Sequence, residues 1–290
     1  MKILQSINSL ANNSKKREKK DANPFTDSSN LEIRELEITV TNKCNLTCRG
    51  CGFNVPNQIS AVNGEGIDQH IAALNTLKGL GLSIGKIVLV GGEAALAKSL
   101  ADYITQIRLV DVSDQIELVT NGLYPQGVTK YVLKQLDSFI ISDYICTDRF
   151  ESTWRQYLET SSYSNKIDFR RKGAWDDLLS EVDNDAVETE EHWKTCFYRN
   201  CDVTLERGRI FSCSRIAKKA WDEQGLLIDS ITSITAISEY LNSTKPKQAC
   251  YSCATVGNCS QIPVAEQVNT NIEKIVTKAE SYMDKVINHG

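Results

Sequence analysis

Apolar runs of strand length alternate with stretches of helical periodicity from Leu31 to residue 172. The run Ile87–Val90 is apolar without interruption, which is typical of a strand buried on both faces of a parallel sheet. Between the runs, apolar residues recur at helical spacing, as at Ile67, Ile71 and Leu74. The runs predict strands over residues 36–40, 87–90, 116–120, 139–145 and 167–171. The stretches between them predict helices over residues 67–77, 97–109, 128–136 and 150–158.

Strands and helices that alternate at these lengths predict βαβ units with right-handed crossovers and a parallel sheet. About five such units fit into residues 31–172. A closed eight-stranded barrel needs a longer chain than this. The sequence therefore predicts an α/β fold whose main domain, residues 31–172, is an open or partial barrel.

Four further segments flank or follow this domain. Residues 1–30 are polar and basic with little periodicity, and we expect a mobile N-terminal arm. Residues 173–195 are strongly acidic, and a solvated, loop-like linker is the default expectation. Residues 196–265 contain six cysteines and little periodicity, so a bound metal is expected to supply much of their folding free energy. Residues 266–290 predict an amphipathic helix that packs on the core.

Composition excludes several classes of function. The chain has 290 residues, of which 41% are hydrophobic, and a net charge of −4, which gives no electrostatic case for nucleic acid or an anionic membrane as a partner. It contains no apolar run of the length that spans a bilayer. The basic N-terminal residues are not followed by an apolar stretch, which argues against a secretory signal. A cytoplasmic location is expected.

The ten cysteines point to metal or redox chemistry, because disulfide frameworks belong to exported proteins. Cys44, Cys48 and Cys51 follow the first strand with the spacing C-x3-C-x2-C. Three thiolates on one loop can hold three corners of an iron–sulfur cube and leave the fourth iron open to a ligand. A structural zinc site would need a fourth ligand, and the nearest remaining cysteine is Cys146.

Three sequence motifs, in their order along the chain, closely resemble those of the radical S-adenosylmethionine (SAM) superfamily. The C-x3-C-x2-C loop is followed by Gly91-Gly92-Glu93-Ala94, where the family has Gly-Gly-Glu-Pro after the second strand. The third motif is the strand end Thr120-Asn121-Gly122. The motifs lie on successive βα units, and the barrel that they define covers roughly half of the chain.

The resemblance implies cofactors and site residues. A [4Fe-4S] cluster on the three cysteines would bind the methionine part of SAM through its open iron. Glu93 would accept a hydrogen bond from the methionine amino group, and Gly91 and Gly92 would permit close approach of the backbone. Asn121 is assigned to the same cofactor site.

Weaker candidates follow the fourth and fifth strands. Ser142 and Asp143 are assigned to the SAM ribose by resemblance. Arg170 and its neighbour Arg171 are candidates for the SAM carboxylate, with a solvated strand end as the equally weighted alternative.

The chain departs from the family pattern at two positions. Gly50 occupies the place of the aromatic residue that usually precedes the third cysteine, and Phe53 is the candidate substitute near the adenine. Ala94 replaces the proline of the glycine-rich motif. Neither departure removes a cluster ligand.

The late cysteines resemble the auxiliary-cluster extensions called SPASM or twitch domains. This resemblance implies one auxiliary [4Fe-4S] cluster, because the cysteines that would hold a second one are absent. Six residues are candidates for four positions, and Cys259 is the expected spare: Cys196, Cys201, Cys213, Cys250, Cys253 and Cys259. The alternative is a zinc ribbon held by cysteine pairs.

The cysteine that stands apart, Cys146, has two interpretations. A buried free cysteine usually acts as a small apolar side chain. The alternative is a catalytic role, in which a spare thiol donates a hydrogen atom to a substrate radical, as radical epimerases require.

A narrower resemblance, carried by residues 196–217, 141–143 and 262–267, is to radical SAM proteins of bacterial polysaccharide loci. It implies oxidation or epimerisation at a carbinol carbon of a small carbohydrate-type substrate, with a flavodoxin- or ferredoxin-type electron donor. One alternative is a maturase acting on a ribosomally made peptide. A second is a non-catalytic zinc or iron–sulfur redox sensor, which would have no use for Glu93.

Overall fold

The computed structural model describes residues 32–55, 66–180, 182–201, 203–219, 222–257 and 259–289. The N-terminal arm expected over residues 1–30 lies outside the described residues. Among the described helices, none has the length and apolar character needed to cross a bilayer.

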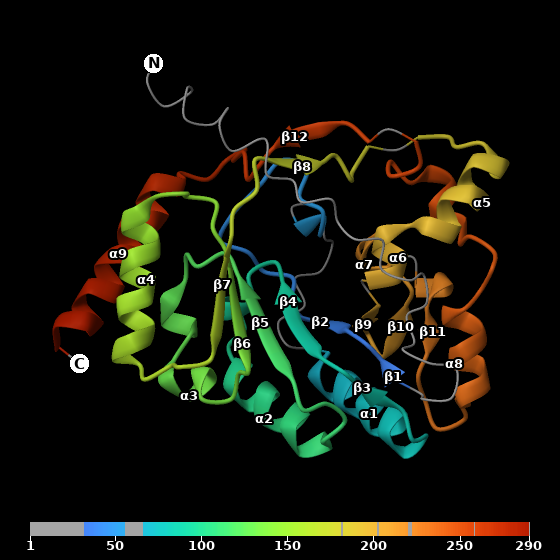
Figure 1. Ribbon diagram of the computed structural model, residues 1–290, viewed down its shortest axis with the longest axis horizontal. Coiled ribbons are helices and arrows are strands. Elements are labelled where there is room, and N and C mark those ends of the chain that lie inside the picture. The colour runs from blue at the N-terminus through green and yellow to red at the C-terminus, as the bar shows by residue number, and fades with distance from the viewer. Residues whose placement is uncertain are drawn as a thin grey trace.

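A largely parallel sheet of eight strands forms the centre of the described structure, with the order β11-β10-β9-β2-β4-β5-β6-β7 (Figure 1). The strands are β2 (Leu36–Thr41), β4 (Ile87–Gly91), β5 (Ile116–Thr120), β6 (Ser138–Ser142), β7 (Lys166–Arg170), β9 (Thr204–Glu206), β10 (Arg209–Phe211) and β11 (Leu226–Leu227). Within this described sheet, β10 pairs in the antiparallel sense with both β9 and β11, and the other neighbouring strands pair in parallel. Strands β7 and β11 are its two ends, so the described sheet is open, and the predicted α/β fold is confirmed.

Four of the described helices cover one face of the sheet. They are α1 (Ile67–Gly79), α2 (Leu100–Val110), α3 (Lys130–Leu133) and α4 (Asp148–Thr160). Apolar side chains at helical spacing, such as Leu77 and Ile104, pack in one core with alternate strand residues such as Ile38, Leu89 and Leu118. The predicted positions of α1, α2, α4 and four of the five barrel strands are therefore confirmed, with small shifts at their ends.

Two local predictions in the barrel are wrong in length. The helix expected over residues 128–136 is only the short α3, preceded by a 3-10 turn, η4 (Pro125–Gly127). The strand expected over residues 139–145 ends at Ser142, because the carboxylate of Asp143 accepts hydrogen bonds from the backbone N–H groups of Ile145 and Cys146 and closes a turn.

The expectation of a loop-like linker over residues 173–195 is wrong. This segment contains β8 (Ala174–Asp176) and α5 (Ala186–Thr195). The Asp185 side chain caps α5 by accepting from the N–H groups of Val187 and Glu188. Thr189 and Trp193 are buried on one face of α5 while its acidic residues face solvent. The acidic composition therefore marks the outer face of a helix.

The cysteine-rich region is also more regular than expected. It contains α6 (Phe197–Cys201), α7 (Ser214–Lys218), α8 (Ile234–Leu241), η6 (Gln248–Ser252) and β12 (Gln261–Pro263). Strand β9 pairs in parallel with β2, so this region continues the barrel sheet through β9, β10 and β11. A small second core forms around Phe211, Cys213 and Ile216.

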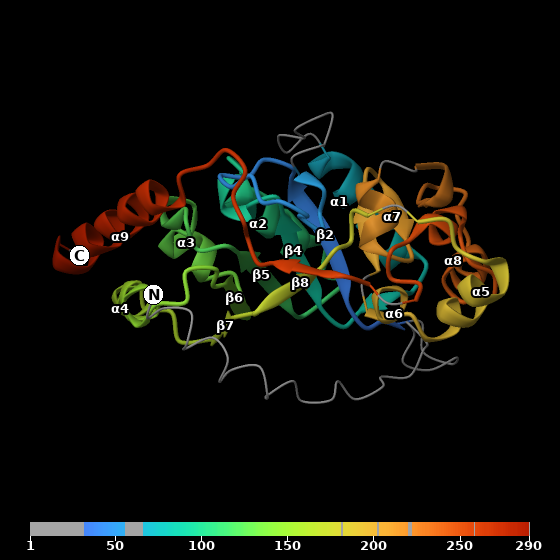
Figure 2. The same ribbon diagram turned by 90° about the horizontal axis from the view of Figure 1, so that it is seen from above.

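The last helix, α9 (Ile272–His289), lies beside α4 at one end of the molecule (Figure 1). Its Ala279 and Met283 are buried, and Arg149 of α4 forms an ion pair with Glu280 at 3.2 Å. The predicted packing of the C-terminal helix on the core is confirmed. The chain reaches α9 through β12, which pairs with β8 in a separate ribbon across one end of the barrel (Figures 1 and 2).

Candidate functional site

The first three cysteines lie on the loop that leaves the carboxyl end of β2. Cys48 is buried, and Cys44 and Cys51 are half-buried against the main core. Burial raises the pKa of the Cys44 thiol to about 12, and the Leu46 N–H, which donates to its sulfur, opposes the shift. Burial also raises the pKa of Cys48, where a hydrogen bond from Gln267 opposes it.

The three sequence motifs meet at this loop. The Nδ2 of Asn121, after β5, donates to Asn45 Oδ1 at 2.8 Å and lies 3.9 Å from the Cys44 sulfur. The Asn121 backbone N–H donates to Glu93, after β4, at 2.7 Å. Parallel strands bring their carboxyl ends to one edge of the sheet, which is why motifs far apart in sequence are in contact here.

The Glu93 carboxylate is buried, with 1% of its surface exposed. It accepts hydrogen bonds from the N–H groups of Ala95 and Asn121 and from the hydroxyl of Thr120. Burial raises its pKa, and these three donors oppose the shift. A carboxylate has about four acceptor positions, so about one is left for a ligand amino group.

The glycine pair of the second motif permits close approach to the cysteine loop. A Cβ on Gly91 would lie 2.5 Å from the Thr41 carbonyl oxygen, and one on Gly92 would lie 2.5 Å from that of Lys43. The N–H groups of Gly92 and Glu93 donate to these same two carbonyls. The close approach expected at these glycines is therefore made by protein backbone that carries the cysteines.

Replacing Gly92 by Ala is expected to displace the cysteine loop, because the added methyl group would overlap the Lys43 carbonyl. We expect lower iron retention after anaerobic reconstitution, measured as iron per chain. Gly79→Ala is the matched control, since no atom lies within 4 Å of its added Cβ. Equal iron in both variants would contradict this role of Gly92.

The two departures from the family pattern have local explanations. Gly50 has a φ of +62°, and the side chain of Ile262 on β12 occupies the place where its Cβ would lie. An aromatic residue is therefore excluded at position 50 in this structure. Ala94 is buried at the start of the turn that Glu93 caps. Phe53 lies near the Nζ of Lys218, which is 5.4 Å from its ring centroid.

The weaker cofactor candidates lie at the ends of β6 and β7. Asp143 is buried and binds Arg171 at 2.7 Å. Arg170 is exposed and pairs with Asp168 at 3.3 Å. Ser142 is half-buried and hydrogen-bonds to Tyr144. The roles of Ser142, Asp143 and Arg170 toward SAM stay predictions.

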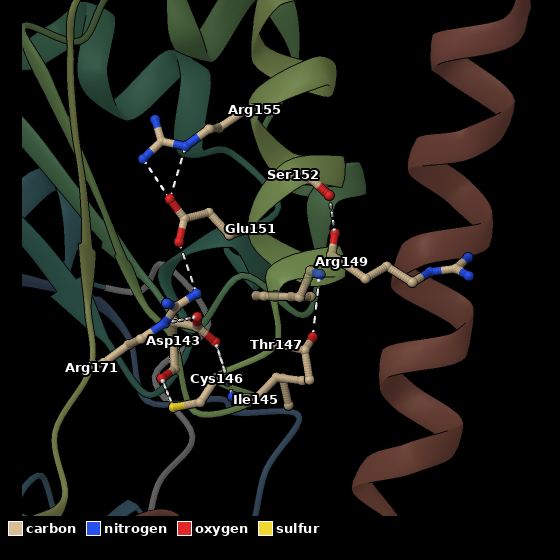
Figure 3. Close-up of polar contacts among 10 residues, drawn as sticks. Asp143, Ile145, Cys146, Thr147, Arg149, Glu151, Ser152, Arg155 and Arg171 are labelled. Carbon is tan, nitrogen blue, oxygen red and sulfur yellow. Dashed lines mark hydrogen bonds and ion pairs between the residues drawn. The ribbon is translucent and has the colours of Figure 1, made fainter. Parts of the chain in front are cut away.

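Cys146 is exposed in the turn that follows β6, with a φ of +55° (Figure 3). Its thiol donates to the Asp143 carbonyl at 3.3 Å. Beside it, Arg171 joins the carboxylates of Asp143 and Glu151 (Figure 3). The interpretation of Cys146 as a buried apolar side chain is wrong, and its role as a hydrogen-atom donor stays a prediction.

Four of the six late cysteines line one pocket in the second core: Cys196, Cys213, Cys250 and Cys253. Cys196 directly follows α5, and Cys213 lies in the loop after β10. Cys250 lies in η6, and Cys253 directly follows η6. Cys201 and Cys259 are not among the lining residues, and the Cys259 thiol donates instead to the Asp177 carbonyl at 3.4 Å. Their assignment as ligands stays a prediction.

The same pocket is lined by the buried guanidinium groups of Arg199 and Arg215. Within the described residues, Arg199 Nε and Arg215 Nε and Nη1 have no hydrogen-bond acceptor. A buried donor without a partner is costly, and an iron–sulfur cube on four thiolates is an anion with sulfur acceptors. The four thiolates are therefore suitable ligands for an auxiliary cluster, and the two buried guanidinium groups match its negative charge and its sulfur acceptors.

No three Cys, His, Asp or Glu side chains among the described residues converge as ligands of one metal ion. In a cubane each thiolate binds its own iron, so the cysteine ligands of a cubane do not need to converge on one ion. His192 also lines the pocket, and its Nε2 lies 3.2 Å from Thr255 Oγ1, which lies 3.1 Å from the Cys253 sulfur.

A buried polar cluster that was not evident from the sequence lies on the face of the sheet opposite α1 to α4. Lys218, at the end of α7, is 2% exposed and contacts Glu206 Oε2 at 2.5 Å and the Thr39 hydroxyl. Thr39 and Glu206 lie on neighbouring strands. The polar residues at alternate positions 37, 39 and 41 of β2 were the available signal, because alternation places them on the face opposite the helices.

No protein-family model matches the chain. Over 111 residues it is 28% identical to a GTP 3',8-cyclase of Moorella thermoacetica, covering 38% of this chain and 33% of the relative. Over 107 residues it is 32% identical to a probable GTP 3',8-cyclase of Methanocaldococcus jannaschii, covering 34% and 32%. Over 142 residues it is 30% identical to molybdenum cofactor biosynthesis protein 1 of Drosophila melanogaster, covering 46% and 24%. The chain thus spans about a third or less of the length of these relatives.

Solved structures give weaker likenesses. The complex of BtrN with AdoMet and 2-DOIA has a TM-score of 0.42 at 15% identity, covering 72% of this chain and 82% of BtrN. The anSMEcpe protein with bound AdoMet has a TM-score of 0.41 at 12% identity, covering 88% and 99%.

The three motifs, together with the partial similarity to GTP 3',8-cyclases, support the resemblance to the radical SAM superfamily. Enzymes of this superfamily bind SAM and a [4Fe-4S] cluster, and the cysteine-rich C-terminal region is compatible with an auxiliary cluster.

Proposed function

We propose that this protein oxidises a carbinol carbon of a small carbohydrate-type substrate by radical SAM chemistry, using one auxiliary [4Fe-4S] cluster. Cys44, Cys48 and Cys51 hold the radical cluster, with SAM bound beside Glu93. When both are bound, the cluster and SAM together supply a 5′-deoxyadenosyl radical that removes a hydrogen atom from a substrate C–H bond. A flavodoxin- or ferredoxin-type electron donor and a cytoplasmic location belong to the same proposal.

The pocket of four cysteines is the observation that carries the oxidation. Cys196, Cys213, Cys250 and Cys253 supply one thiolate for each of four irons. Full ligation leaves no open iron for a substrate, which favours a role in accepting an electron. Oxidation of a CH–OH group to a carbonyl removes two electrons and two protons, and one of each leaves with the hydrogen atom. The second electron therefore needs an acceptor within the protein.

The buried polar cluster on the face of the sheet opposite the helices supports a polar substrate. Buried ion pairs such as Lys218–Glu206 seldom add net stability, and this pair supports a role in recognition of a polar substrate. Burial raises the pKa of Glu37 on the same face to about 7, with Lys218 opposing the shift.

The proposal is tested by assaying the reconstituted protein anaerobically with SAM, a reductant and a panel of sugars, nucleotide sugars and aminocyclitols. We expect 5′-deoxyadenosine and a ketone product in equal amounts. Cys146→Ala should turn over normally, because oxidation needs no thiol donor. An inverted substrate with loss of turnover in Cys146→Ala would establish epimerisation instead, and turnover only with a peptide would establish a maturase.

A further inference from the structure

Residues 265–270, here called the strap, lie across the loop of the first three cysteines. The backbone N–H of Arg49 donates to the Glu266 carbonyl at 2.7 Å, and that of Val268 donates to the Thr47 carbonyl at 3.1 Å. These two bonds flank an isolated antiparallel bridge. The strap therefore pairs with the cysteine loop as a short strand would.

Side chains reinforce this pairing. The hydroxyls of Thr47 and Thr270 lie 2.7 Å apart, and the Asn269 N–H donates to the Thr47 hydroxyl at 3.2 Å. The ion pair between Arg49 and Glu266 is largely exposed, so it adds little to the stability of the contact. The hydrogen bonds of the strap are thus concentrated on Thr47 and its neighbours.

Gln267 is the strap residue that reaches a sulfur. Its Nε2 donates to the Sγ of Cys48 at 3.1 Å and to the Ala265 carbonyl at 2.6 Å. Its Oε1 accepts from the Thr47 N–H at 2.9 Å. The opposite orientation of the amide would place its NH2 group against that N–H and its oxygen against the Ala265 carbonyl. The surrounding backbone therefore orients the amide with its NH2 group toward the sulfur.

A hydrogen bond to a cluster thiolate has a definite effect on reduction. The reduced cluster carries one more negative charge than the oxidised cluster, and a donor to sulfur stabilises that charge. Such outer contacts tune metal sites without binding the metal. Because Cys48 is buried, water does not supply an equivalent donor.

We propose that Gln267 is a positioning residue that orders the cysteine loop and raises the reduction potential of the cluster on Cys44, Cys48 and Cys51. This inference rests on the proposed function for the identity of that cluster. The strap connects the auxiliary region, which ends with β12, to α9, so the segment that leaves the auxiliary region supplies the residue that tunes the radical site.

The test compares Gln267→Glu and Gln267→Leu with the wild-type protein. The first variant keeps the acceptor for the Thr47 N–H and replaces the donor to Cys48 by a carboxylate. The second removes both groups. We expect the midpoint potential of the SAM-responsive cluster, followed by electron paramagnetic resonance in a redox titration, to become more negative in both. Thr270→Val, which weakens the strap without changing the sulfur bond, should leave the potential unchanged.

A second readout uses the iron-free protein. Gln267→Leu is expected to speed hydrogen exchange at the Thr47 amide, which donates to Gln267 Oε1, relative to the wild-type protein and Thr270→Val, as measured by peptide mass spectrometry. Unchanged potentials in both Gln267 variants would overturn the inference, as would an equal shift in Thr270→Val. A wild-type protein that assembles no SAM-responsive cluster would overturn the proposed function instead, and the exchange rates would still test whether Gln267 orders the cysteine loop.

Discussion

The double variant Cys250→Ala/Cys253→Ala is expected to bind about four irons per chain where the wild-type protein binds about eight. Both residues line the pocket in the second core, and their loss removes two of its four thiolates. The three cysteines after β2 are untouched, so SAM should still be cleaved when a strong reductant is supplied. Oxidised product should disappear, because the second electron then has no acceptor. Iron, acid-labile sulfide and product yield are the measurements.

The chain supplies a matched control in Cys201→Ala/Cys259→Ala. These two cysteines belong to the same region but do not line the pocket. The control variant should retain about eight irons per chain and form product at the wild-type rate. If it loses iron while the Cys250/Cys253 variant does not, the assignment of the four ligands is wrong. A wild-type protein with about four irons and one zinc would establish the zinc ribbon instead.

Glu93→Gln is expected to abolish SAM cleavage and to destabilise the protein. The carboxylate accepts from two backbone N–H groups and one hydroxyl, on both of its oxygens. An amide presents one oxygen and one NH2 group, so in either orientation a buried donor faces another donor. Leaving such groups unsatisfied lowers the free energy of unfolding by about 2–4 kcal/mol. Urea denaturation of the iron-free protein and the yield of 5′-deoxyadenosine measure the two effects.

Thr120→Val separates these two effects, because it removes one donor to Glu93 and leaves the carboxylate in place. It should cost about 1 kcal/mol of stability and preserve most of the SAM cleavage. If Glu93→Gln leaves the urea stability unchanged, the hydrogen bonds that Glu93 accepts do not stabilise the fold. Unchanged cleavage would refute the assignment of Glu93 to SAM.

Local patterns made much of the barrel predictable. The strands and helices up to residue 172 follow from periods that lie within each element, and only their ends needed tertiary contacts. The turn after Ser142 depends on the Asp143 carboxylate, which competes with continuation of the strand. Helix α5 is not evident from the sequence because acidic residues dominate the segment, and Thr189 and Trp193 alone mark its buried face.

By itself, the sequence determined the class of chemistry. Three thiolates on one loop are a local feature, and the two later motifs follow strands whose order fixes where they meet. Which late cysteines share a pocket was decided only by the tertiary structure, because Cys196, Cys213 and Cys250 are brought together by the packing of the second core. The contact of Gln267 with Cys48 joins residues 219 positions apart. No periodicity or spacing reports such a pair, since it exists only when the C-terminal segment lies across the cysteine loop.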